Sequence, residues 1–146
     1  MPERVPEISR CSCVLPLRLS PFGPPLFLIH GVDGSVAPLQ QLAGRVRTDR
    51  IVYGIQSHAW CGSAPVLTAI EEMAAHYLSE VLRLQPQGPY YLTGSSYGGM
   101  VAFEMAQQLL CKGLTVGLLG LIDSSDMSYL TRHSGTAPFW VRAGTR

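Results

Sequence analysis

The 146-residue chain has little charge and no excess of either sign. Eleven Lys and Arg against ten Asp and Glu leave a net charge of +1, so no basic surface is predicted and nucleic acid is excluded as a partner. Charged residues make up 14% of the chain and hydrophobic residues 47%. This balance is typical of a globular protein with a sizeable core, not of a disordered chain.

The sequence also lacks long apolar runs. None approaches the ~20 residues that a membrane-spanning helix needs. The first ten residues, MPERVPEISR, carry charges and prolines where an export signal needs an apolar core. We therefore expect a cytoplasmic protein that makes no membrane contact.

Cysteine is scarce, with four residues at positions 11, 13, 61 and 111. Cys11 and Cys13 are too close in sequence for a usual zinc-binding pair, and the other two have no matched spacing. The spacing therefore predicts no metal site. Four reduced cysteines in a cytosolic protein is the interpretation that we favour.

What the chain does have is an alternation of short apolar runs with helical patterns. We expect strands at 26–30, 51–55, 89–93 and 116–122, and helices at 38–46, 67–82 and 97–111. A capping box of Thr68 and Glu71 fits the start of the second helix, although Pro65 allows an earlier start. Strand and helix repeated three times, followed by a strand, predict an α/β fold with a mostly parallel sheet and helices on both faces.

One motif stands between an expected strand and an expected helix. Gly94 to Gly98 read G-x-S-x-G, with Ser96 at the centre. A serine on a sharp strand-to-helix turn is held clear of the chain, where its hydroxyl can attack a carbonyl carbon. Gly94 and Gly98 would allow the tight turn and the close approach of strand and helix. Ser96 is therefore the predicted nucleophile.

Two further loops follow strands at the same edge of the expected sheet, the edge at which α/β proteins bind ligands. Asp123 ends the strand after the serine and is placed to orient an imidazole, with Asp126 as a weaker alternative. An acyl-transfer site also needs two donors for the oxyanion. We expect these to be the backbone N–H groups of Tyr97 and Val32, with Gly31 allowing close approach.

The general base is the missing part. His30 ends the strand that leads to the expected oxyanion donor, so we expect it to shape that loop. His58 and His76 are interpreted as loop and helix-surface residues. His133 is the only histidine after Asp123, but it follows by ten residues, where a strand and a helix normally intervene between acid and base. The histidine-bearing portion is expected to be absent from this chain.

With these residues in view, the chain resembles the type I thioesterase domains that end nonribosomal peptide, polyketide and animal fatty acid synthases. The matching segments are PPLFLIHGVDGS (24–35), IVYGIQS (51–57), LQPQGPYYLTGSSYGGMVAFEMAQQL (84–109) and LLGLIDSS (118–125). The resemblance implies a partial α/β-hydrolase fold without its last strands and lid. We divide the chain into an amino-terminal segment 1–23 that could form an edge strand, a core at 24–128 and a divergent tail at 129–146.

The resemblance implies release of an acyl, peptidyl or polyketide chain from a carrier-domain thioester, by hydrolysis or cyclisation. Ser96 would form the acyl-enzyme, Asp123 would be the triad acid, and Val32 and Tyr97 would line the oxyanion hole. No cofactor of its own is implied, since phosphopantetheine belongs to the carrier partner. A chain that stops after the strand at 116–122 would also expose an apolar edge, so self-association is expected.

Two alternatives remain open. Thr93 to Met100 is similar to the phosphate-binding turn of short-chain dehydrogenases, with Asp123 as the ribose-binding acid, but Met100 replaces the last glycine and the turn follows a late strand. The chain could also be a hydrolase fragment that binds without catalysing.

Overall fold

The computed structural model of the protein describes residues 12–61 and 67–124. Their elements are, in chain order, β1 (Val14–Arg18), β2 (Phe22–Ile29), α1 (Ala37–Arg45), β3 (Arg50–Ile55), η1 (His58–Cys61, a 3-10 helix), α2 (Ile70–Leu84), β4 (Tyr90–Ser95), α3 (Tyr97–Cys111) and β5 (Val116–Ile122). The predicted alternation of strands and helices is confirmed.

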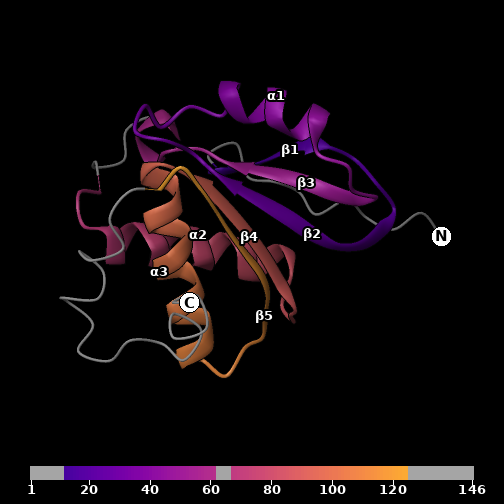
Figure 1. The fold of residues 1–146 in the computed structure, drawn as a ribbon. Coiled ribbons are helices and arrows are strands. Elements are labelled where there is room, and N and C mark those ends of the chain that lie inside the picture. The colour runs from indigo at the N-terminus through magenta and orange to yellow at the C-terminus, as the bar shows by residue number, and fades with distance from the viewer. Residues whose placement is uncertain (1–11, 62–66, 125–146) are drawn as a thin grey trace, which may run out of the picture.

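The five strands form one sheet in the order β1-β3-β2-β4-β5 (Figure 1). β1 runs antiparallel to β3, and the other neighbouring strands are parallel. The parallel strands β2, β4 and β5 therefore end at the same edge of the sheet. The loops that carry the predicted site residues follow these three strands.

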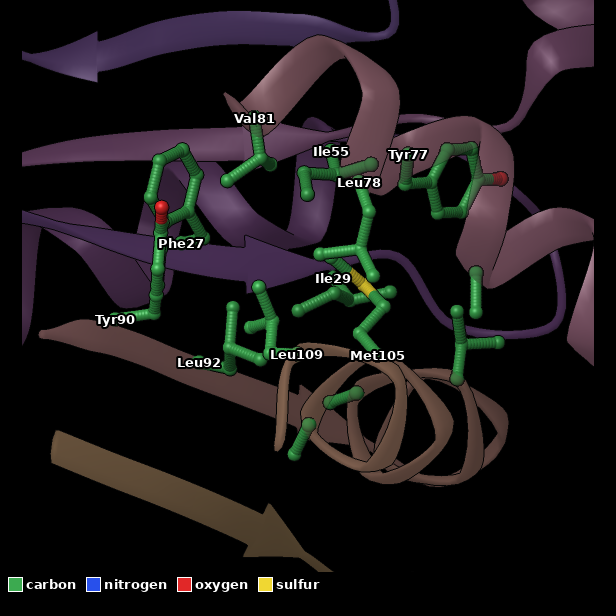
Figure 2. Close-up of a cluster of buried hydrophobic side chains, with 14 of the residues drawn as sticks. Phe27, Ile29, Ile55, Tyr77, Leu78, Val81, Tyr90, Leu92, Met105 and Leu109 are labelled. Carbon is green, nitrogen blue, oxygen red and sulfur yellow. The ribbon is translucent and has the colours of Figure 1, made fainter. Parts of the chain in front are cut away.

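Helices cover both faces of the sheet, as predicted, with α1 on one face and α2 and α3 on the other (Figure 1). β2 contributes alternate side chains to the two layers. Leu26 and Leu28 pack with α1, while Phe27 and Ile29 belong to the larger cluster with α2 and α3 (Figure 2). This division explains why the strand has an unbroken apolar sequence. Burial of each apolar side chain of this size contributes about 1.5–3 kcal/mol to the stability of the fold.

The start of α2 differs from the prediction. The helix begins at Ile70 with Ala69 as its N-cap, and no side chain caps it, so the proposed capping box of Thr68 and Glu71 is wrong. Thr68 is exposed and precedes the N-cap position. Glu71 and Glu72 lie in the first turn, where negative charge interacts favourably with the helix dipole.

None of the helices within 12–61 and 67–124 has the length and apolar character required to cross a bilayer.

Candidate active site

Ser96 lies between the end of β4 and the beginning of α3, with its side chain exposed. Its φ and ψ are 53° and −120°, in a region that favours glycine. Its backbone is fixed on both sides, because Ser96 N–H donates to Ile122 O (2.9 Å) and Gly99 N–H donates to Ser96 O (3.0 Å). The predicted sharp turn is therefore present, and it presents the hydroxyl at the end of the sheet.

The glycines beside Ser96 allow close packing. A Cβ on Gly94 would lie 2.0 Å from Gly98 O, and a Cβ on Gly98 would lie 2.3 Å from His30 O. Neither glycine has a positive φ, so the strained conformation belongs to Ser96 itself. The absence of Cβ atoms at these two positions allows α3 to pack closely on β4 and on the end of β2.

Asp123 follows β5 as Ser96 follows β4. Ser95 and Ile122 are register partners in the parallel pair of β4 and β5. Ser96 and Asp123, the residues that follow them, therefore lie side by side where these strands end. Asp123 has a φ of 47° and is exposed. In the described part of the chain, Ser96 and Asp123 are the two non-glycine residues with positive φ. Asp126 lies outside the described residues.

The loop after β2 forms a tight turn from Gly31 to Gly34, closed by Gly34 N–H donating to Gly31 O (3.1 Å). Val32 lies within this turn, and the residue is 87% exposed. His30 O, just before the turn, contacts Gly98 in the first turn of α3. The loop bearing Val32 N–H thus packs on the helix end bearing Tyr97 N–H, where amide hydrogens point out of the helix.

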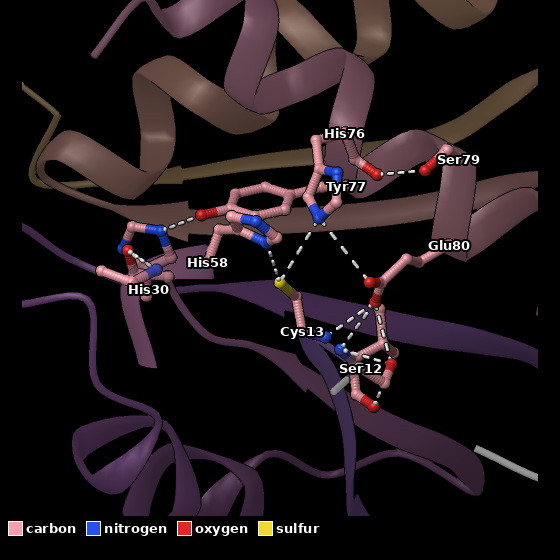
Figure 3. A network of polar contacts seen from close by, with 11 residues as sticks. Ser12, Cys13, His30, His58, His76, Tyr77, Ser79 and Glu80 are labelled. Atoms are coloured by element: carbon pink, nitrogen blue, oxygen red, sulfur yellow. Dashed lines mark hydrogen bonds and ion pairs between the residues drawn. The ribbon is translucent and has the colours of Figure 1, made fainter. Parts of the chain in front are cut away.

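The His30 side chain connects the loop after β2 to Tyr77 on α2 (Figure 3). It is 2% exposed, and its Nδ1 lies 2.6 Å from Gly31 O while its Nε2 lies 2.7 Å from the Tyr77 hydroxyl. Because a carbonyl oxygen can only accept, Nδ1 carries the proton and Nε2 accepts from Tyr77 O–H. Burial lowers the pKa of His30, against smaller opposing effects of the Gly31 hydrogen bond and of Asp33. The ring is neutral, with both nitrogens engaged.

The structure also brings together residues that sequence spacing left apart. Cys13 Sγ lies 3.7 Å from His58 Nδ1 and 3.7 Å from His76 Nε2, beside Glu80 (Figure 3). Burial, followed by the neighbouring His58, lowers the pKa of His76. Sequence separations of 45 and 63 residues give no local signal for this cluster. His133 lies outside the described residues.

Comparisons with known proteins identify the family to which the chain belongs. The family model described as "Thioesterase domain" matches residues 24–137. Malpibaldin synthetase from Mortierella alpina is 40% identical over 119 residues, which is 82% of this chain and 2% of the synthetase.

Two solved structures are similar in fold and sequence. A four-domain nonribosomal peptide synthetase bound to AMP and glycine matches with a TM-score of 0.75 and 36% identity over 79% of this chain and 9% of its own. The NocB thioesterase domain, in covalent complex with a fluorophosphonate nocardicin G analogue, matches with a TM-score of 0.65 and 35% identity over 70% of this chain and 46% of its own. The chain therefore spans less than half of each of these relatives, and it belongs to the thioesterase domain family.

Proposed function

We propose that this chain carries the nucleophile of a thioesterase that releases an acyl or peptidyl chain from a carrier-domain thioester. One observation supports this proposal above the others. Ser96 and Asp123 have positive φ and lie at neighbouring strand ends. Strained non-glycine residues of this kind cluster at active sites.

In the proposed reaction, Ser96 Oγ attacks the thioester carbonyl carbon while a base removes its proton. The C–S bond breaks, the pantetheine sulfur leaves and takes that proton, and an ester to Ser96 remains. Water or a nucleophile within the acyl chain then attacks the ester and frees Ser96. Val32 N–H and Tyr97 N–H would hold the oxyanion, and loss of one such donor typically costs about 10²–10³-fold in rate. Asp123 would orient the base.

None of the described histidines is assigned as the base. Both ring nitrogens of His30 are engaged, and His58 and His76 each direct one ring nitrogen at Cys13. We therefore propose that the isolated chain reacts slowly, with His133 as the histidine of this sequence still to be tested.

These engaged histidines also favour the second candidate function, a non-catalytic fragment that binds its partner. The dinucleotide-binding alternative loses its support, because the thioesterase family model covers the turn at 93–100.

Labelling with a fluorophosphonate tests the proposal, since the related NocB domain forms a covalent complex with such a compound. We expect slow incorporation of one phosphonyl group, abolished by Ser96→Ala and retained by Ser95→Ala, a neighbouring serine at the end of β4. Absence of labelling after long exposure would favour the binding fragment. Fast labelling that His133→Ala slows about 10²–10⁴-fold would assign the base to His133.

A further inference from the structure

A polar cluster with no part in the proposed acyl transfer joins β1, η1 and α2. Cys13 precedes β1 directly, His58 begins η1, and His76 and Glu80 occupy successive turns of α2. Figure 3 shows the thiol between the two imidazole rings, with the Glu80 carboxylate on the other side of His76 Nε2. Cys13 is fully buried and the two rings are half-buried.

The distances in this cluster match those between the ligands of a tetrahedral zinc ion. Zn–S and Zn–N bonds of roughly 2.3 and 2.0–2.1 Å at tetrahedral angles put sulfur and nitrogen ligands about 3.6 Å apart. Cys13 Sγ lies 3.7 Å from both His58 Nδ1 and His76 Nε2. All three donor atoms lie within 4.8 Å of one another, so rotation of the rings can bring them around one ion.

Glu80 borders the cluster but lies outside its set of three donor residues, Cys13, His58 and His76. Its Oε1 lies 3.7 Å from His76 Nε2. Its other oxygen, Oε2, accepts hydrogen bonds from Cys13 N–H (2.7 Å), Val14 N–H (3.2 Å) and the Ser12 hydroxyl (2.8 Å). The carboxylate is therefore fixed in place, and its hydrogen bond from Cys13 N–H helps to position the thiol.

We propose that Cys13 Sγ, His58 Nδ1 and His76 Nε2 bind a zinc ion, with water as the fourth ligand. The set of one thiolate and two imidazoles has the borderline-soft character that zinc prefers. Binding displaces the thiol proton of Cys13 to solvent. The ion would tie the edge strand β1 and the η1 turn to α2, which gives it a structural role.

Cobalt titration of the full chain tests this site, after reduction and removal of metal with a chelator. We expect one Co²⁺ per chain, a thiolate-to-cobalt absorption band in the near ultraviolet, tetrahedral d–d bands in the visible, and loss of all of them on addition of zinc. Cys13→Ser and His76→Gln are expected to weaken binding by more than 100-fold, and Glu80→Gln by about 10–100-fold. Cys111→Ser, which alters an exposed thiol on α3, is the matched control and should bind normally.

The site would be refuted by the absence of a thiolate band, or by unchanged affinity in Cys13→Ser. Binding lost in Cys11→Ser but retained in Cys13→Ser would assign the metal to another cysteine and equally overturn the proposal. If the buried substitutions unfold the chain, as circular dichroism would show, His58→Gln on the η1 turn supplies the decisive comparison. Unchanged affinity in that variant would also refute the site.

Discussion

Ser96 and Asp123 adopt φ values of 53° and 47°, a conformation that costs a non-glycine residue about 1–3 kcal/mol. Such strain persists only where the surroundings hold the backbone in place. At Ser96 they do so through the hydrogen bond to Ile122 O and through the close contact of Gly98 with His30 O. The strained conformation of Ser96 therefore depends on the ends of β2 and β5, which hold its backbone in place.

Gly98→Ala tests this dependence. The new Cβ would lie 2.3 Å from His30 O, a backbone atom that cannot move without shifting the loop. We expect a loss of about 3 kcal/mol in the free energy of unfolding, at the upper end of overpacking effects. Gly44→Ala is the matched control, because no atom lies within 4 Å of its added Cβ. This helical substitution should stabilise by about 0.5–1 kcal/mol. Urea denaturation measures both, and equal effects would contradict the packing argument.

His30 predicts a pH dependence of stability. Burial lowers its pKa in the folded chain, so the unfolded chain binds the extra proton first as the pH falls. The free energy of unfolding should therefore decrease below about pH 6.5, with a slope of at most about 1.4 kcal/mol per pH unit from this residue. His76 acts in the same direction.

The measurement is urea denaturation from pH 7.5 to 5.5 with a chelator present. His30→Asn keeps a donor for Gly31 O and cannot titrate, so it should flatten the slope. His76→Asn should remove the second contribution. A wild-type slope unchanged by His30→Asn would show that the ring is not buried in its neutral form.

At the scale of elements, the sequence predicted α3 and β5 to the residue, because glycine-rich loops and strong apolar patterns mark their ends. The Ser96 turn and its place beside Asp123 were predictable for the same reason. The start of α2 was not, since no side chain caps it and its first residue, Ile70, packs against the core cluster. The Cys13 cluster could not be predicted, because it forms where β1 pairs with β3 at the sheet edge, a tertiary contact without a local pattern.

Glu80 links two of these elements and gives a test at this scale. Its Oε2 accepts hydrogen bonds from Cys13 N–H and Val14 N–H at the beginning of β1. Glu80→Ala removes that acceptor from a buried position and should cost about 1–3 kcal/mol of stability.

Glu80→Gln retains one acceptor oxygen and should cost less. Glu72→Ala, in the exposed first turn of α2, is the control and should cost no more than about 1 kcal/mol. Thermal unfolding of the three variants without metal measures the order of their stabilities. A Glu80→Ala protein as stable as the control would show that β1 does not depend on this carboxylate.

At the scale of the whole molecule, β5 has a neighbour on one side only in the part of the chain that the structure describes. Leu118 on this strand is 48% exposed. An exposed apolar edge strand favours pairing with a second chain, so we expect the isolated chain to associate as its concentration rises.

Sedimentation velocity tests this expectation. Leu118→Lys should shift the distribution toward the monomer, because charge on an edge strand opposes pairing. Leu110→Lys, at a comparably exposed leucine (42%) on α3, should leave association unchanged. A wild-type chain that remains monomeric at all concentrations would contradict the expectation.

The central claim is that Ser96 forms an acyl-enzyme, and mass spectrometry of the chain after exposure to an acyl thioester of a pantetheine analogue tests it most directly. We propose that this chain reacts slowly, and an acyl-enzyme in which the attacking water is not deprotonated persists, so the ester should accumulate when deacylation is slower than acylation. We predict one added acyl group on the peptide that contains Ser96, lost in Ser96→Ala and kept in Ser95→Ala. An acyl group found on a cysteine instead, or none after prolonged exposure, would contradict the account.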